Sequence, residues 1–247
     1  MLEVQKLHKS LGGLHVVNDV SFTVQAGEIV ALIGPNGAGK STTFNMLNGQ
    51  LAPDAGDITL QGQSLLHLKP HDICRRGVGR TFQIAETFAS LTVLENVQMA
   101  LLAQHQKTFS FWQRATHYQS DAALALLTQV ELDTQAHRPC SALAYGDIKR
   151  LELAMVLAGQ PRVLLLDEPT AGMALAERRL LIGLVRRLVN QHQMAALFTE
   201  HSMDVVFDFA DRVLVMARGQ LIAQGTPSEV QHNPAAQAAY FGSGALL

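Results

Sequence analysis

A glycine-rich segment near the start of the chain has the residues needed to bind phosphate. Residues 34–42 read Gly-Pro-Asn-Gly-Ala-Gly-Lys-Ser-Thr, between an apolar run at 29–33 and a helical pattern that begins near Phe44. Strand, glycine loop and helix in this order form the context of a P-loop, whose backbone N–H groups point at the anion. Lys40 would reach the β- and γ-phosphates, and the Ser41 hydroxyl would bind Mg²⁺. The sequence therefore predicts a nucleoside triphosphate site, built from Asn36, Gly37, Ala38, Gly39, Lys40, Ser41 and Thr42.

Two adjacent carboxylates far downstream could complete this chemistry. Asp167 and Glu168 follow residues 163–166, a short and wholly apolar run that is typical of a strand buried on both faces. In P-loop ATPases a carboxylate at the end of such a strand holds Mg²⁺, usually through water. A neighbouring glutamate can orient or deprotonate the attacking water. We therefore expect Asp167 to act as a metal ligand and Glu168 as a catalytic residue, although most Asp-Glu pairs are solvated surface charges.

The composition limits the classes of function. A chain of 247 residues with 48% apolar and 16% charged residues can bury a core, as one domain or two subdomains. The net charge of −2 and the lack of a basic block disfavour nucleic acid as the main partner. Cys74 and Cys140 have no metal-ligand spacing, which indicates reduced thiols in a cytosolic protein. Residues 1–6 do not resemble a signal peptide, and no apolar run approaches the roughly 20 residues that span a bilayer, so a membrane role would require a partner.

The elements that would position these residues can be traced along the chain. Alternating apolar residues predict strands over 2–24 and near 58–61, which we expect to form an antiparallel sheet. Further patterns predict a strand at 195–198, an amphipathic helix at 176–191 and a hairpin over 213–223. Thr226 and Glu229 have the spacing of a helix capping box.

The middle of the chain has a different pattern. Residues 64–82 contain Pro70 and two glycines, Gly77 and Gly79, and from about 93 to 127 the periodicity becomes helical. The polar and aromatic piece at 107–120 is expected to be an exposed segment of a mainly helical insertion. A helix is also expected at 151–158, ended by Pro161.

Taken together, the motifs resemble those of the ATP-binding subunit of ABC transporters, along nearly the whole chain. Residues 34–42 match the Walker A motif and 163–168 match Walker B. Gln83, in Arg-Thr-Phe-Gln, occupies the Q-loop position, and His201 occupies the position of the switch histidine. The signature position is occupied by 143–147, Leu-Ala-Tyr-Gly-Asp. Five motifs in the family's order are far more specific than any one of them.

The resemblance implies an α/β fold. It consists of a P-loop (RecA-like) core with a parallel sheet, an N-terminal antiparallel β subdomain and a helical insertion subdomain. The chain would be a single ABC ATPase domain over 1–247. Residues 1–83 and 159–247 would form the core with the antiparallel β subdomain, and 84–158 the mainly helical subdomain.

The resemblance also implies roles for residues that would otherwise be unremarkable. ATP and Mg²⁺ would be the cofactors, with Gln83 joining Ser41 and Asp167 as metal ligands. His201 would donate to the γ-phosphate and act in catalysis with Glu168 and Lys40. Without the resemblance, Gln83 would be an ordinary loop amide and His201 a surface histidine.

The partners follow from the same resemblance. In this family Tyr145 and Gly146 would contact ATP held by a second ABC ATPase subunit, identical or homologous, and MgATP binding would close the dimer. Residues 84–158 would dock onto transmembrane permease subunits, with Phe88, Leu91 and Val93 either contributing or packing in the subdomain core. A substrate-binding protein would take part indirectly. The chain would lie on the cytoplasmic face of the inner or plasma membrane, held there by the permease.

Within the family, several stretches are similar to the branched-chain amino acid transport ATPases. They include 12–20, 79–83, 143–147 and the tail from 233 to 242. The implied function is an importer of hydrophobic amino acids or a related small molecule.

Three positions depart from the family pattern. Ala144 replaces the signature serine, and Ala174 replaces the usual D-loop aspartate, so neither side chain can accept a hydrogen bond. Near Leu11, where many members stack an aromatic ring on adenine, Leu11, Val16 and Val17 could offer only apolar contact.

Three other interpretations remain open at this stage. A soluble ABC ATPase that acts on DNA or ribosomes would share the core, but such chains usually carry long coiled coils or two cassettes. A regulatory subunit with a degenerate site is suggested by Ala144 and Ala174, whereas the intact loop and both carboxylates argue against it. A P-loop kinase would leave the signature segment and His201 without a role.

Overall fold

A six-stranded, mainly parallel sheet forms the centre of the molecule. The computed structural model describes residues 1–81, 87–104 and 119–241. The strand order is β10-β9-β3-β8-β7-β6, and only β10 runs antiparallel to its neighbour. The strands are β3 (Ile29–Ile33), β6 (Val78–Thr81), β7 (Val163–Asp167), β8 (Ala195–Thr199), β9 (Arg212–Ala217) and β10 (Gln220–Gly225).

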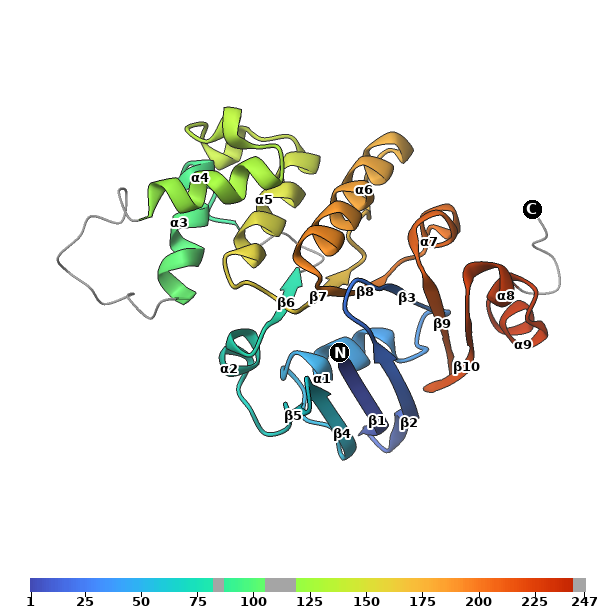
Figure 1. Ribbon diagram of the computed structural model, residues 1–247. Helices are drawn as coiled ribbons and strands as arrows, with labels where there is room; N and C mark the ends of the chain where they lie inside the picture. Colours follow the sequence, from blue (N-terminus) through green and yellow to red (C-terminus); the bar gives the residue numbers. More distant parts are fainter. Residues whose placement is uncertain (82–86, 105–118, 242–247) are drawn as a thin grey trace.

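A second sheet is antiparallel and lies beside the first, at the bottom of Figure 1. Its order is β2-β1-β4-β5, with Leu2 paired to both Val24 and Leu60. The strands are β1 (Leu2–Leu11), β2 (Leu14–Val24), β4 (Ala55–Leu60) and β5 (Gln63–Ser64). The antiparallel N-terminal sheet expected from the alternation is thereby confirmed.

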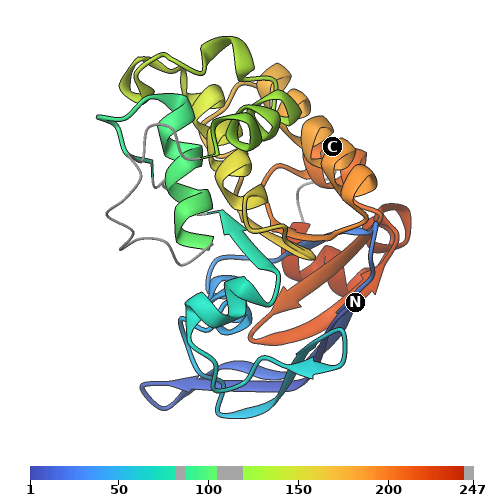
Figure 2. The same ribbon diagram turned by 60° about the vertical axis from the view of Figure 1, so that its left-hand side comes forward.

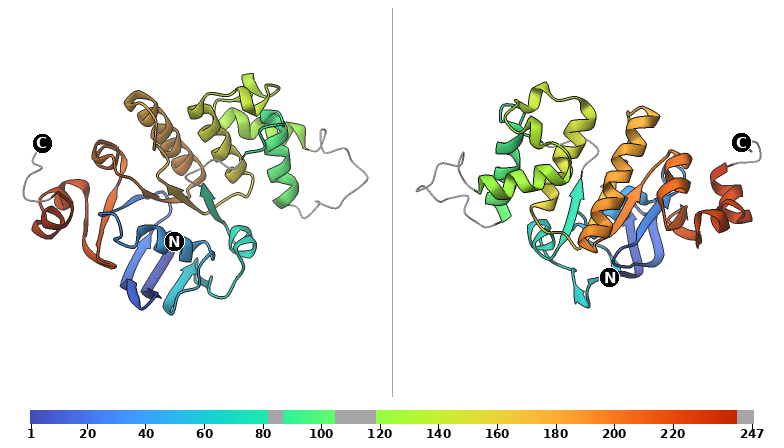
Figure 3. Two further views of the ribbon diagram at one scale, coloured as in Figure 1. Left: turned by 180° about the vertical axis from the view of Figure 1, so that it is seen from behind. Right: turned by 45° about the horizontal axis from the view of Figure 1, so that its top comes forward.

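Helices cover the central sheet and form a separate layer above it. Helices α3, α4 and α5 pack together, whereas α8 and α9 lie at the opposite end of the molecule (Figures 1 and 3). Figure 2 shows the α3–α5 group standing clear of the antiparallel sheet. The helices are α1 (Lys40–Leu47), α2 (Pro70–Arg75), α3 (Val93–Gln104), α4 (Ser120–Gln129), α5 (Tyr145–Leu157), α6 (Leu175–His192), α7 (Met203–Phe209), α8 (Pro227–Gln231) and α9 (Pro234–Ala236), with short 3₁₀ turns at Asp133–Gln135 and Cys140–Ala142 and a π-turn at Gln237–Phe241.

The central sheet separates two hydrophobic cores. Along β3, Ile29, Ala31 and Ile33 face the core shared with helices α3 to α6, while Val30 and Leu32 face the core shared with the antiparallel sheet and α1. The same alternation continues in β7 and β8. Side chains that alternate between two apolar faces explain why these strands read as continuous apolar runs.

The parallel register brings distant segments to one edge of the sheet. Asp167 at the end of β7 pairs with Thr199 at the end of β8, and Thr199 pairs with Leu32 of β3. The segments that follow these three strands therefore start at the same edge. In parallel α/β sheets this edge is where ligands bind.

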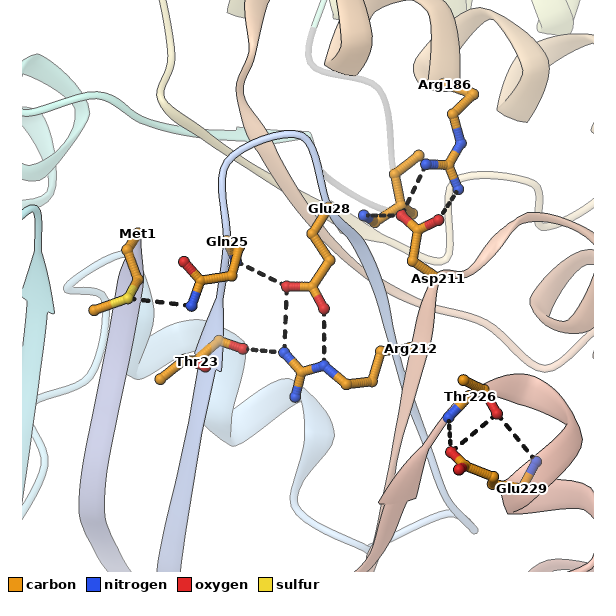
Figure 4. A network of polar contacts seen from close by, with 10 residues as sticks. Met1, Thr23, Gln25, Glu28, Arg186, Asp211, Arg212, Thr226 and Glu229 are labelled. Carbon is orange, nitrogen blue, oxygen red and sulfur yellow. Dashed lines mark hydrogen bonds and ion pairs between the residues drawn. The ribbon is translucent and has the colours of Figure 1, made fainter.

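An ion pair joins the two sheets behind the P-loop strand. Arg212 of β9 donates through Nε to Oε1 of Glu28 at 2.8 Å, and its Nη2 reaches both Oε2 of Glu28 and the carbonyl of Thr23 in β2 (Figure 4). On the other side of β3, Arg186 pairs with Asp211 at 2.8 Å. The loop that leads from β2 into β3 is thus held against the start of β9.

The structure corrects some expected boundaries. Helix α5 begins at Tyr145, six residues before the expected start at 151, so the signature residues lie in its first turn. The segment 64–82 contains a helix, α2, and a strand, β6, that the sequence pattern did not predict. Of the expected exposed segment at 107–120, residues 107–118 lie outside the described part of the chain. The capping box of Thr226 and Glu229 is confirmed at the start of α8.

Candidate nucleotide site

The loop between β3 and α1 needs glycine at two positions. Gly39 has φ +102°, and a Cβ atom there would lie 2.5 Å from the carbonyl oxygen of Val16. At Gly34 a Cβ atom would lie 2.1 Å from the carbonyl oxygen of Met216. A side chain at either position would force the loop away from the strands beneath it. Both glycines therefore hold the loop tightly against the edge of the sheet.

Lys40 lies inside this loop, with its side chain largely buried. Its Nζ donates to the carbonyl oxygens of Gly34 at 2.7 Å and Pro35 at 3.2 Å. Burial lowers the pKa of Lys40, and the charges of Glu168 and Asp167 oppose that shift. Glu168 and Asp167 thus lie near enough to Lys40 for their charges to act on its ammonium group.

Asp167 is fixed from both sides. Its Oδ1 accepts a hydrogen bond from the hydroxyl of Thr199 at 2.8 Å, and its Oδ2 pairs with Nη2 of Arg80 at 2.9 Å. Thr199 is fully buried and lies on the neighbouring strand, so the carboxylate is held at the end of β7. One cationic and one hydroxyl donor therefore orient the two oxygens of this carboxylate, at the position expected for a ligand to a cation or its bound water.

Glu168 has a strained backbone and faces His201. It adopts φ +47°, a conformation that residues other than glycine rarely take. Its N–H donates to both the carbonyl and the hydroxyl oxygen of Thr199, at 3.2 and 3.0 Å, which holds the turn in place. Nε2 of His201 lies 3.0 Å from Oε1 of Glu168. Strain of this kind is concentrated at functional sites, and here it directs the carboxylate toward the histidine.

Glu200 is a buried carboxylate that ties the two strand ends to the loops beyond them. It accepts from the N–H and the hydroxyl of Thr170, which follows Walker B, with the N–H at 3.1 Å. It also accepts from the N–H groups of His201 at 3.1 Å and Ser202 at 3.4 Å. Glu200 thus couples the position of His201 to the segment that leads to Ala174.

The expected metal ligands offer hard oxygen donors. Ser41 is exposed in the first turn of α1, and Asp167 is partly buried at the end of β7. No group of three or more His, Cys, Asp and Glu side chains with metal-binding geometry occurs in the described part of the chain. This donor set suits Mg²⁺, which keeps several waters and binds through few carboxylates together with substrate phosphates. Gln83 lies outside the described residues.

The signature residues lie at the start of α5, apart from the loop. Ala144 is the N-cap and makes no side-chain capping bond, so the first N–H groups of the helix remain available to an acceptor. Tyr145 is 45% exposed. Gly146 is closely approached, since a Cβ atom there would lie 3.4 Å from Met173. No hydrogen bond or ion pair between described residues joins Tyr145 or Gly146 to residues 34–42.

Not all of the residues expected to contact the adenine ring have an accessible side chain. Val17 is completely buried in the core beneath the loop and packs against Gly39, so its side chain offers no surface to a base, and this expectation is wrong. The register of β2 against β1 shifts on either side of Lys9, which turns Val17 inward. Leu11 is 45% exposed and Val16 is half-buried, so these two residues keep accessible surface.

Known proteins with similar sequences are ATP-binding proteins, in agreement with this site. The family model described as ABC transporter matches residues 17–171. The chain is 42% identical to the high-affinity branched-chain amino acid transport ATP-binding protein LivG of Salmonella typhimurium, over 98% of both chains. The chain belongs to the ABC transporter family. It is therefore an ABC ATPase, the ATP-hydrolysing and nucleotide-binding subunit of a transporter.

Other relatives of this ABC ATPase agree in sequence and fold. It is 38% identical to the corresponding protein BraF of Pseudomonas aeruginosa, over 98% of both chains. The ADP conformation of a crystallised ABC transporter cassette superimposes with a TM-score of 0.86 at 27% identity, over 98% of this chain and 99% of that one. A nucleotide-free cassette gives 0.85 at 26% identity, over 97% and 98%. The predicted P-loop α/β fold is thereby confirmed.

Sequence reasoning missed three residues of this ABC ATPase site. Arg80, Thr199 and Glu200 all bond to the residues expected to do the chemistry, yet none was assigned a role. Each adjoins a recognised motif, Arg80 in the stretch that ends at Gln83 and the other two beside His201. For Thr199 and Glu200 the signal that could have identified them is a hydroxyl or charged side chain at the end of an apolar strand, whereas Arg80 has no such signal.

Proposed function

We propose that this ABC ATPase drives the import of branched-chain or other hydrophobic amino acids, or of a related small molecule. The observation that carries the ATPase chemistry is the convergence of Lys40, Asp167, Glu168 and His201 at one edge of the sheet. The substrate class rests on the relatives, whose names specify branched-chain amino acid transport. The family model described as a branched-chain amino acid ATP-binding cassette transporter also matches residues 220–245.

The reaction is in-line attack of water on the γ-phosphate of ATP. Glu168 orients or deprotonates that water, and His201, which lies beside the Glu168 carboxylate, donates to the γ-phosphate. Lys40 moves its ammonium group from the loop carbonyls to the phosphates, where it offsets developing negative charge. Ser41, Asp167 and Gln83 would hold Mg²⁺, which would supply further charge neutralisation.

A second ABC ATPase subunit completes the site. The free N–H groups at the start of α5, from Tyr145 and Gly146, suit a phosphate, because a helix N-terminus favours anions. Within one chain these groups make no bond to the loop, which supports a site assembled across two subunits. ATP binding then closes the dimer and hydrolysis reopens it.

The permease docks at the groove between the core and the helices. A cavity of about 340 Å³ lies there, bordered by α2, β6, α3 and α5. Phe88 is 51% exposed beside this group of helices, which suits a contact residue, and Leu91 is half-buried. Val93 is fully buried in the helical core, so the core alternative holds for it.

No helix among the described residues is long and apolar enough to span a bilayer. We place the chain at the cytoplasmic membrane surface through the permease.

Reconstitution with candidate permeases tests this proposal. The experiment uses proteoliposomes that contain the permeases, this chain and a partner ATPase. ATP is supplied on the side of the membrane that faces the ATPase, and a binding protein loaded with radiolabelled leucine is supplied on the other side. Leucine is expected to accumulate on the side that holds ATP. The matched control carries Lys40→Met. ATP hydrolysis without leucine uptake would reject the substrate class. Hydrolysis by the partner alone, unaffected by Lys40→Met, would assign this chain a regulatory role.

A further inference from the structure

Arg80 connects three parts of the nucleotide site with one side chain. It lies on β6, only 8% of its side chain is exposed, and its guanidinium stacks 5.8 Å from the ring centre of Phe44. Its Nη2 pairs with Oδ2 of Asp167 at 2.9 Å. Its Nη1 donates to Oδ1 of Asn45 in α1 at 2.8 Å and to Oε1 of Gln50 at 3.1 Å. Strand β6, the P-loop helix and the Walker B carboxylate are thus joined by one planar cation.

This arrangement places a fixed positive charge on the expected metal ligand. Thr199 occupies Oδ1 of Asp167 and Arg80 occupies Oδ2. A divalent cation that reaches this carboxylate, directly or through water, must share it with the guanidinium. Two cations a few ångströms apart repel each other, and the repulsion is substantial in a partly buried site. The Thr199 bond is neutral, so of the two side chains bonded to this carboxylate only Arg80 competes electrostatically.

The same residue also reaches the groove between the core and the helices. Arg80 borders the cavity there together with its neighbour Gly79 and with Glu152 of α5. Arg80 therefore lies between Asp167 and this groove, at the end of β6 and three residues before Gln83 in the sequence. A surface arginine could not link these two places, because its charge would be screened by water.

We propose that Arg80 is a positioning residue that competes with the divalent cation for Asp167, and so couples metal loading to the position of β6. This inference rests on the proposed metal role of Asp167. Arg80 holds the carboxylate in place before the metal arrives. Metal loading then loosens the bond between Arg80 and Asp167, which releases the end of β6 next to the groove.

The effect of metal on ADP affinity provides the test. Isothermal titration calorimetry of the purified chain gives the dissociation constant of ADP in EDTA and in saturating Mn²⁺. The constant in EDTA divided by the constant in Mn²⁺ measures how much the metal strengthens ADP binding. Arg80→Gln and Arg80→Met are expected to raise this ratio about tenfold, with metal-free ADP affinity within twofold of wild type. Arg80→Lys keeps the charge and is expected to keep the ratio within twofold.

Two further variants separate the possible failures. Arg76→Gln removes a nearby exposed arginine that bonds to Gln63 and should leave the ratio unchanged. Asp167→Asn should lower the ratio, and an unchanged ratio there would mean that Asp167 is not a metal ligand, which refutes the metal assignment itself. If Asp167→Asn lowers the ratio while the neutral Arg80 variants leave it unchanged or lower it, the competition is refuted. A rise in Arg80→Lys equal to that in Arg80→Gln would also refute it.

Discussion

Nε2 of His201 lies 3.0 Å from Oε1 of Glu168, and the two side chains come from the ends of adjacent parallel strands. The N–H of Glu168 is held by Thr199, and the N–H of His201 is held by Glu200, so both residues have a fixed backbone. The pair is therefore positioned before the nucleotide binds. Catalysis in this ABC ATPase depends on which atoms this pair offers to the attacking water.

Replacing the carboxylate tests the role of Glu168. Glu168→Gln keeps the size and the bond to His201 but removes the base, so ATP hydrolysis should fall at least about a hundredfold. ATP affinity, measured by equilibrium dialysis, should stay near wild type, and size-exclusion chromatography with ATP should show a trapped dimer. Glu229→Gln, far along the chain in the α8 cap, is the control with unchanged turnover. Hydrolysis near the wild-type rate in Glu168→Gln would assign the base elsewhere.

The pH dependence of nucleotide binding should report on Lys40. In the nucleotide-free protein burial holds the pKa of Lys40 below the ordinary lysine value, and bound phosphates would raise it again. Between these two pKa values binding takes up a proton, so ATP affinity should decrease as the pH rises through that window. Calorimetric titrations at increasing alkaline pH measure the slope. Lys40→Met should bind more weakly with no slope in this range, and an equal slope in both proteins would contradict the assignment.

The hydroxyl of Thr199 serves both carboxylates of the site. It donates to Asp167 at 2.8 Å and accepts from the N–H of Glu168 at 3.0 Å. Thr199→Val keeps the shape but removes both bonds, which should lower kcat about tenfold and unfolding free energy by about 1–2 kcal/mol. Thr199→Ser keeps the hydroxyl and should retain most of the activity. Equal activity in the two variants would show that the hydroxyl has no part in positioning.

Ala174 leaves the longest helix of the described chain without a side-chain cap. It is the N-cap of α6, where its N–H donates to Glu177 at 3.2 Å and its carbonyl accepts from the N–H of Arg178 at 3.0 Å, but its side chain has no acceptor. Ala174→Asp introduces an acceptor for the first N–H groups and a charge that favours the helix dipole, which should stabilise the fold by about 1 kcal/mol. Urea denaturation measures the change. Ala174→Val adds bulk without an acceptor, and an equal gain in that variant would disprove capping as the cause.

The ion pair between β9 and the loop before β3 should contribute to stability. Arg212 and Glu28 are mostly buried, with 24% and 17% of their side chains exposed. Arg212→Met leaves Glu28 and the Thr23 carbonyl without this donor, so unfolding free energy should fall by about 2 kcal/mol. Arg179→Met breaks a similar pair with Asp208 whose side chains are 57% and 48% exposed, and should cost less than about 0.5 kcal/mol. Equal losses in urea titrations would contradict this ranking.

The parts of the fold that depend on local chemistry could be predicted from the sequence. The loop at 34–42 is specified by its own glycines and by the apolar strand before it. The α8 cap is specified by Thr226 and Glu229. In both cases the residues that determine the conformation are neighbours in the chain.

The parts that depend on distant pairing could not be predicted. Strand β6 reads Val-Gly-Arg-Thr, which has no apolar alternation, and it forms because it pairs with β7 some 85 positions later, as in Val78 with Val163. The bond of Arg80 to Asp167 spans 87 positions. The inward orientation of Val17 follows from irregular pairing with β1. No local pattern encodes these relationships. The ends of the buried strands, by contrast, could be predicted to meet at one edge of the sheet, because those strands are apolar throughout.

Strand β3 belongs to both hydrophobic cores, since its five residues alternate between them. Loss of either core would expose half of the strand that carries the P-loop. The helical layer and the antiparallel sheet therefore cannot melt separately without dismantling the nucleotide site. Heating should produce a single calorimetric transition in which loss of nucleotide binding and loss of structure coincide, and limited proteolysis should yield no active fragment.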